Sequence, residues 1–280
     1  MFKDIVVPIT ATQGDNDAIN VGVTLAGALE AKLTLLEMVN LPTPMGSPWG
    51  LVPDVGMSEV YSRLRAQGEI NVARLKSRLA QESIPSDVRL VESMFAEPAQ
   101  LVAHHAHYAD LSIVAGAIGD TDEGAVTQSY FGGLLLQSGR PVLVVPPRCK
   151  ATMPPKRIVL AWRPTREATR ALHDALPFLK LAERVDVLVV NAVGGELGHG
   201  EQPGTDVATH LARHGVSANV VQRDSKTRSV SSIILEHARE SHAQMIVAGG
   251  YGHSRFREWA MGGVTRELLI TAPVPVFYSH

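Results

Sequence analysis

The chain has 280 residues, a length that fits two compact domains of about 140 residues each. Its formal net charge is -2 and it carries no block of basic residues, so the composition argues against a nucleic-acid-binding protein. No apolar run approaches the ~18 residues of a membrane span, and the first residues lack the pattern of a signal peptide. We therefore expect no membrane contact and a cytoplasmic location.

Apolar runs bounded by turn residues predict five strands in the first half, at residues 4–10, 33–39, 87–93, 111–117 and 140–147. The second half repeats this order, with predicted strands at residues 157–163, 184–193, 217–223, 244–250 and 274–280. Between the strands lie segments with the spacing of amphipathic helices, among them residues 16–31, 59–82, 167–182 and 204–215. The chain therefore reads as an internal duplication.

Strands that are apolar throughout and alternate with helices predict parallel sheets covered by helices on both faces. We expect an α/β fold with two doubly wound, five-stranded, Rossmann-like domains at residues 1–148 and 155–280. The proline-rich connector around residues 146–155 can continue neither a strand nor a helix, and it marks the boundary. When residues 113–119 are aligned with residues 246–252, His104 also falls on His237.

The last strand of each half is short and preceded by proline, in the sequences "RPVLVVPP" and "APVPVFYS". These features are typical of edge strands, whose unpaired backbone groups need a cover or a partner. We predict that the two last strands pair with each other, so that the tandem chain forms its own pseudo-symmetric dimer. Association of two chains into a further homodimer stays open.

A glycine motif follows the fourth strand of the second half, where ligands bind in open parallel sheets. Gly249-x-x-Gly252 is followed by nine residues and then by Gly262-Gly263-Val264-Thr265, which leads into a predicted helix. Glycines let backbone N–H groups approach a ligand, and a helix start favours phosphate. The alternative is that the turn needs glycine for its geometry alone. The G-x-G-x-x-G and P-loop patterns of other nucleotide-binding proteins are both absent.

The stretch "GGYGHSRFREWAMGGVTRELL" closely resembles the signature of the universal stress protein family, which is G-x-x-G, nine residues, then glycine followed by Ser or Thr. The resemblance extends to the opening strands "KDIVVPIT" and "KRIVLAW", to the fourth strands "DLSIVAG" and "QMIVAGG", and to the closing strand "RPVLVVP". It covers nearly the whole chain, twice. It implies a tandem universal stress protein that acts in the stress response through ligand occupancy or protein contacts.

In nucleotide-binding members of that family, the glycine motif wraps the phosphates, while an acidic residue at the end of the first strand and a residue on the second strand flank the adenosine. The resemblance therefore implies that the second half binds ATP or a related nucleotide, with Mg²⁺ only as a companion of the nucleotide. The implied nucleotide-binding residues are Ala161, Trp162, Arg163, Val190, Gly249, Gly252, His253, Arg255, Gly262, Gly263, Val264 and Thr265.

The sequence departs from the family pattern at three positions. The acidic position at the end of the first strand holds Thr10 in the first half and Arg163 in the second, and the Ser/Thr position of the signature holds Gly263. In the first half the glycine stretch is followed by acidic residues that would repel a polyphosphate, namely Asp120, Asp122 and Glu123. We therefore expect the first half to be degenerate for nucleotide binding.

Three functions remain open on these observations: a nucleotide-binding stress module, a universal stress protein that works through protein or other ligand contacts, and a weak Mg²⁺-dependent ATPase. No G-x-S-x-G elbow and no evident general base occur, so we assign no catalytic residue. The run His104-His105-x-His107 lacks cysteine or carboxylate partners, and we expect no metal site there.

Two further segments have both a functional and a structural interpretation. The single cysteine, Cys149, lies in the connector and is expected to be incidental rather than nucleophilic. The segment 41–60 is rich in Pro, Gly and Met and follows a strand, so it is either a lid or partner patch or a packed loop.

Overall fold

The computed structural model describes residues 1–43, 46–47, 50–51, 55–116, 119, 121–192, 202–251 and 263–280. The first half contains β1 (Asp4–Ile9), α1 (Asp15–Leu29), β2 (Lys32–Asn40), β3 (Gly46–Ser47), β4 (Gly50–Leu51), α2 (Val55–Leu79), β5 (Ser86–Ser93), α3 (Pro98–Ala106), β6 (Leu111–Ala115), α4 (Asp122–Gln137) and β7 (Val142–Val145). The second half contains β8 (Arg157–Trp162), α5 (Arg166–Leu179), β9 (Arg184–Val190), α6 (Thr205–Arg213), β10 (Ala218–Arg223), α7 (Val230–Glu240), β11 (Met245–Gly249), α8 (Gly263–Thr271) and β12 (Val276–Ser279).

All ten strands predicted from the apolar runs are present, and they form one continuous sheet in the order β10-β9-β8-β11-β12-β7-β6-β1-β2-β5. Neighbouring strands within each half are parallel, as the α/β prediction requires. The last strands of the two halves, β7 and β12, pair with each other and run antiparallel, with Leu143 opposite Phe277. The predicted pseudo-dimer is therefore confirmed, because a two-fold relation reverses the direction of the pairing strand.

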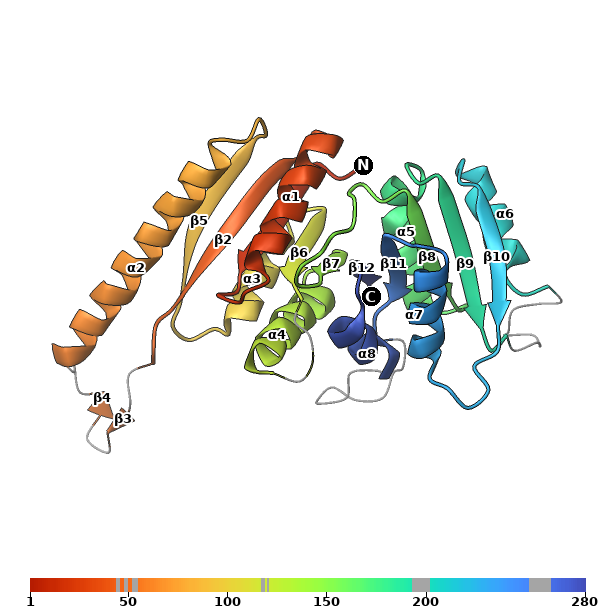
Figure 1. Ribbon diagram of the computed structural model, residues 1–280. Helices are drawn as coiled ribbons and strands as arrows, with labels where there is room; N and C mark the ends of the chain where they lie inside the picture. Colours follow the sequence, from red (N-terminus) through yellow and green to blue (C-terminus); the bar gives the residue numbers. More distant parts are fainter. Residues whose placement is uncertain are drawn as a thin grey trace.

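The described helices cover both faces of this sheet (Figure 1). Helices α1, α2, α5 and α6 contribute buried residues to one core cluster, among them Leu25, Leu75, Leu172 and Leu211. The remaining long helices contribute to the cluster on the other face, among them Val102 of α3, Leu134 of α4, Ile234 of α7 and Leu268 of α8. Each cluster extends across both halves, so the two halves share their cores.

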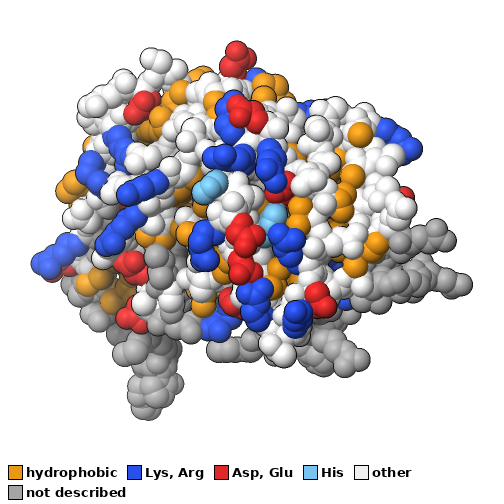
Figure 2. Space-filling model, turned by 45° about the vertical axis from the view of Figure 1, so that its right-hand side comes forward, with side chains coloured by type: hydrophobic (Ala, Val, Ile, Leu, Met, Phe, Trp, Pro, Cys, Tyr) orange, Lys and Arg blue, Asp and Glu red, His pale blue; other side chains and the backbone are white. Residues whose placement is uncertain are grey.

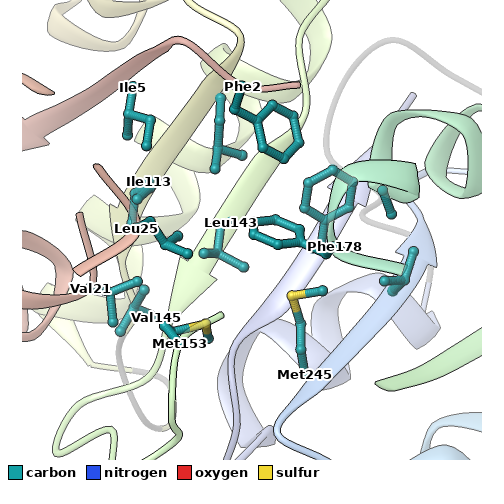
Figure 3. Packing of buried hydrophobic residues seen from close by; sticks show 14 of the residues in the cluster. Phe2, Ile5, Val21, Leu25, Ile113, Leu143, Val145, Met153, Phe178 and Met245 are labelled. Carbon is teal, nitrogen blue, oxygen red and sulfur yellow. The ribbon is translucent and has the colours of Figure 1, made fainter. Parts of the chain in front are cut away.

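Aromatic side chains cover the seam between β7 and β12 on both faces. On one face the ring centroid of Phe178 lies 5.1 Å from that of Phe2 and 5.9 Å from that of Phe277. Figure 3 shows Phe178 of the second half pointing toward Phe2 and Leu143 of the first. On the other face the ring centroid of Phe131 lies 4.9 Å from that of Tyr278. Contacts of this kind add to the burial energy, so the seam is part of the core rather than a loose junction.

The connector between the halves has no helix or strand from residue 146 to residue 156, as its prolines predict. It is nonetheless anchored, because Met153 is buried in the core cluster shared by the two halves (Figure 3). Among the described residues, no helix is long and apolar enough to cross a membrane.

Strand order reverses once in each half, between β1 and β6 and between β8 and β11. The recorded pairing of β1 with β6 ends at Val6 and Ser112, and that of β8 with β11 ends at Leu160 and Val247. Beyond these residues the strands part at their carboxyl ends. Ligands of open α/β sheets bind at such points, which we call the first and the second mouth.

Candidate functional site

The second mouth is formed where β8, β9 and β11 end and where α8 begins. Ala161 at the end of β8, Val190 at the end of β9 and Val264 in the first turn of α8 are all half-buried at the edge of the same core cluster. These three predicted residues therefore lie on the same face of the sheet. Trp162, the next residue after Ala161, packs against the cluster on the opposite face, because side chains alternate along a strand.

Arg163 is the first residue after β8, and it is exposed. Its side chain makes no ion pair within the part of the chain that the structure describes. The turn that follows is short: the Thr165 hydroxyl oxygen accepts a hydrogen bond from the Ala168 N–H group at 3.3 Å and caps α5. A guanidinium group thus occupies the position where the family pattern has a carboxylate.

Two glycines at the end of β11 are required by packing. A Cβ atom on Gly249 would lie 2.7 Å from the backbone nitrogen of Ala168, at the start of α5. A Cβ atom on Gly250 would lie 2.5 Å from the side chain of Leu135, which belongs to α4 of the first half. Packing therefore explains why both positions hold glycine, whether or not a ligand binds.

Gly263 differs from these two glycines, because no heavy atom of the residues that the structure describes lies within 4 Å of a Cβ atom built on it. It is exposed and opens the first turn of α8. Four other predicted residues, Gly252, His253, Arg255 and Gly262, lie outside the described residues.

Thr265 is buried in α8, and its hydroxyl oxygen accepts a hydrogen bond from the backbone N–H of Tyr251 at 3.3 Å. The Tyr251 ring in turn lies 6.1 Å from the ring of Phe131, on α4 of the first half. In the opposite direction, the Gly119 N–H of the first half donates a hydrogen bond to the Ile270 carbonyl oxygen of α8 at 3.3 Å. The two glycine stretches therefore meet at the seam between the halves.

A carboxylate that the sequence analysis did not consider lies beside the second mouth. Glu167 is in the first turn of α5, its side chain is 14% exposed, and its Cβ atom is 3.0 Å from the position of a Cβ atom on Gly249. It forms an ion pair with Arg166 at 3.7 Å. The sequence does contain a signal for this residue: Glu167 is an acidic residue in the first turn of the helix that follows the first strand of the second half, where the helix dipole favours negative charge.

The first mouth is organised around Asp15, which is buried at the start of α1. The Thr10 N–H lies 3.1 Å from both carboxylate oxygens of Asp15, and the Thr10 hydroxyl donates to one of them at 2.7 Å. Burial raises the pKa of Asp15 above its ordinary value, while hydrogen bonds from Thr10 and from the Ala11 and Thr12 N–H groups act in the opposite direction. The backbone donors of this turn are thus taken by a carboxylate of the protein itself.

A second buried carboxylate lies near Asp15 in the first mouth. One oxygen of Glu37, on β2, accepts a hydrogen bond from the Asn71 amide at 2.8 Å, and the other has no hydrogen-bond partner. Burial is the main reason that the pKa of Glu37 is raised. Burial, followed by the charges of Asp15 and Glu37, raises the pKa of Tyr130 to about 12. This environment is unfavourable for a polyphosphate.

The acidic residues that led to that prediction lie beside the same mouth. Asp122 and Glu123 form the first turn of α4, and the Gln13 N–H donates to the Glu123 carboxylate at 3.4 Å. Asp120 is not among the described residues.

A hollow of about 370 Å³ lies at the opposite, amino edge of the second half, lined by Arg157, Arg184, His237, Glu240, Ser241 and His242. Beside it Asp186 is buried; burial acts to raise its pKa, but hydrogen bonds from Arg184, Asn219 and His237 outweigh burial and hold the pKa below its usual range. Figure 2 shows basic, acidic and histidine side chains intermixed on this side of the molecule. The mixture of signs gives no extended basic surface.

The histidine run and the cysteine have local structural roles. The ring of His107 lies 2.9 Å from the carbonyl oxygen of Gln137, within hydrogen-bond distance, while His104 is exposed. Burial raises the pKa of the Cys149 thiol, which leaves less thiolate at neutral pH. The segment 41–60 lies in part outside the described residues; within it β3 and β4 form a short antiparallel pair.

Comparisons with known proteins agree with this architecture. Residues 155–279 match the family described as "Universal stress protein family". A universal stress protein from Archaeoglobus fulgidus DSM 4304 has a TM-score of 0.72 at 14% identity, and the alignment covers 99% of this chain and 97% of that chain. A putative universal stress protein from Pseudomonas aeruginosa UCBPP-PA14 has a TM-score of 0.58 at 17% identity, with 99% and 93% covered.

A protein from Pseudomonas aeruginosa PAO1, PA1789, described as functionally unknown, has a TM-score of 0.59 at 15% identity and covers 99% of this chain and 92% of its own. The comparison with curated proteins gave no match. The structural similarities extend over both halves at low identity, so for the first half they carry the fold, while the family match carries the second half. The second half of the chain therefore matches the universal stress protein family, and the first half repeats the fold of that family.

Proposed function

We propose that this protein is a stress-response module whose second mouth binds ATP or a related nucleotide, and that the first half is a scaffold without a nucleotide of its own. The proposal includes two domains, at residues 1–148 and 155–280, that act as one unit because their cores are continuous. Regulation would then come from occupancy of a single site per chain.

The observation that carries the proposal is the open start of α8 beside an apolar shelf. Gly263 faces free space, so the backbone N–H groups of the first helical turn are accessible to an anion. Directly after it, Val264 lies at the edge of the same cluster as Ala161 and Val190. An adenosine group on this shelf would have its phosphates within reach of the helix start.

The charges around the second mouth also support an anionic ligand. Exposed Arg163 could contact phosphate oxygens, because a guanidinium group forms strong hydrogen bonds with them. Glu167 offers a carboxylate for a ribose hydroxyl, a role that Arg163 cannot fill in the family position. Mg²⁺ would enter this site only with the nucleotide, since the described residues gather no carboxylate cluster for it there.

Calorimetry with Mg²⁺–ATP on the purified chain tests the proposal directly. We expect one site per chain, with at least tenfold weaker binding in Arg163→Glu, which reverses the charge next to the phosphates. The matched control is Arg239→Glu, an equally exposed arginine in the last turn of α7, and we expect it to bind ATP as the parent does.

Two results would overturn the proposal. One is the absence of binding at millimolar ATP, which would favour a universal stress protein that works through protein or other ligand contacts. The other is an equal loss of ATP binding in both arginine variants, which would mean that the affinity for ATP depends only on the overall charge of the protein.

A further inference from the structure

Three histidines from two helices face one another on the outer surface of the second half. His173 lies in the middle of α5, His210 lies in α6, and His214 is the C-cap residue of α6. Their ring centroids are separated by 5.1 Å for His173 and His210, 6.0 Å for His173 and His214, and 4.7 Å for His210 and His214. The spacing His210-x-x-x-His214 places two of the rings on one side of α6.

The helices that carry these histidines are held in place by the core. Leu172, next to His173, and Leu211, next to His210, are both buried in the cluster beneath α5 and α6. The backbone positions of the three histidines are therefore fixed, and only side-chain torsions remain to be set when a ligand binds.

The ring nitrogens form the geometry of a metal site. One nitrogen from each histidine lies within 4.8 Å of the other two. Ligand nitrogens on a tetrahedral Zn²⁺ ion, at about 2.0–2.1 Å from the metal, are about 3.4 Å apart. Small side-chain rotations would close that difference. His173 is exposed, which leaves a route for the ion and a place for water as the fourth ligand.

The hydrogen bonding of the cluster indicates that a partner is missing. The Nε2 atom of His210 is buried and has no hydrogen-bond partner among the described residues, although a buried polar atom without one is costly. A metal ion at the centre of the three rings would satisfy this nitrogen.

The equivalent junction in the first half is closed without a ligand. Aligning β1 with β8 from their first residues places Asn20 of α1 opposite His173 of α5, and the buried Ile19 opposite the buried Leu172. There Arg78 of α2 donates hydrogen bonds to the side chains of Asn16 and Asn20, at 2.9 and 2.6 Å. Direct hydrogen bonds thus join the helices of the first half, whereas the second half offers three imidazoles around a common centre.

We infer that His173, His210 and His214 form a binding site for Zn²⁺ or another divalent transition metal that prefers nitrogen ligands. An all-imidazole donor set suits such ions and does not suit Mg²⁺ or Ca²⁺, which prefer oxygen ligands. The metal joins α5 to α6 and stabilises the second half. This inference does not depend on nucleotide binding.

The test uses the full chain, purified without a histidine tag and treated with a chelator before titration with Zn²⁺. We expect one ion per chain, competition with a chromophoric chelator, and a melting temperature that rises with Zn²⁺, because a ligand that binds only the folded state stabilises it. Titration with Co²⁺ is expected to give the visible absorption of a cobalt ion with nitrogen ligands, which reports coordination directly.

His173→Gln is the informative variant, since this side chain is exposed and its loss leaves the core intact. We expect Zn²⁺ binding to weaken at least tenfold and the metal-dependent rise in melting temperature to disappear. His104→Gln is the matched control, because His104 is also an exposed helical histidine with a histidine neighbour on its own helix, His107. It is expected to bind Zn²⁺ as the parent does.

Several outcomes would overturn the inference. These are the absence of saturable binding of one ion per chain, equal affinity in the parent and His173→Gln, or a loss of binding in His104→Gln instead. Folding of each variant is checked by its far-ultraviolet circular dichroism and by its melting temperature without metal.

Discussion

The two mouths of this molecule have the same fold and opposite electrostatics. In the first mouth Asp15 lies at the start of α1 and takes the N–H groups and the hydroxyl of the turn after β1. In the second mouth the equivalent helical position holds Ala168, and the residue after β8 is an exposed arginine. The first mouth thus contains a carboxyl group of the protein itself, whereas the second mouth has no acidic side chain at the equivalent position.

This difference shows that two copies of one fold can place different charges at equivalent positions. Glu37 adds a second buried carboxylate to the first mouth, so a polyphosphate there would meet two like charges at low dielectric. The seam meanwhile binds the glycine stretches of both halves to each other's helices through Leu135, Tyr251 and Ile270. The first half therefore packs closely against the second at the seam.

The largest effect is expected from the glycine that packs against a helix start. Gly249→Val should lower the free energy of unfolding by about 3 kcal/mol, because its Cβ atom would collide with the backbone of α5. Gly263→Ala, in open space, should change it by less than about 0.5 kcal/mol. Urea denaturation measures both, and equal effects at the two positions would contradict our division of the motif into packing and ligand glycines.

Removal of the internal anion should come next. Asp15→Ala leaves the N–H and hydroxyl donors of the first mouth without their acceptor, and we expect a loss of about 1–3 kcal/mol in unfolding free energy. Asp15→Asn keeps one acceptor oxygen and should lose less. If Asp15→Ala were as stable as the parent, the carboxylate would not hold the turn.

The reciprocal change should convert the second mouth into a copy of the first. Ala168→Asp places a carboxylate at the position that matches Asp15, and we expect ATP to bind at least about tenfold weaker, which corresponds to about 1.4 kcal/mol. Ala168→Asn has nearly the same shape without the charge and should bind ATP better than the aspartate variant. Calorimetry compares them, and identical affinities would argue that charge at this position does not control the site.

The smallest effect is expected from Glu37→Gln and should depend on pH. Burial raises the pKa of Glu37 in the folded state, so ionisation of this carboxyl disfavours folding. The protein is therefore most stable with Glu37 protonated, and it loses stability as the pH rises through the raised pKa. The glutamine variant cannot ionise and can still accept the Asn71 hydrogen bond. Its melting temperature should exceed that of the parent at pH 7, and the two should converge below about pH 4, near the ordinary pKa of a glutamate. A difference that does not vary with pH would contradict the raised pKa of Glu37, because stability depends on pH only where the folded and unfolded states bind different numbers of protons.

Much of the fold could be predicted because the signals are local. Short apolar runs bounded by turn residues, such as residues 157–163, indicate buried strands, and the prolines of the connector interrupt any regular element. The pairing of the two last strands also followed from their edge character, and the structure confirms it. The set of site residues was harder to predict: Ala161, Val190 and Val264 pack on one face of the sheet, whereas Trp162 packs on the other.

The sequence by itself determined the α/β architecture, the duplication and the family resemblance of the second half, because periodicity and the spacing of a glycine motif are properties of short segments. Only the tertiary structure decided that Asp15 closes the first mouth, that Gly249 is required by α5, and that His173 meets His210 and His214. Each of these contacts joins different elements or the two sides of a turn, and its geometry is set by how the helices pack on the sheet. Hydrophobic patterning fixes which face of a helix is buried, but the polar side chains that meet at its ends and edges depend on the packed arrangement.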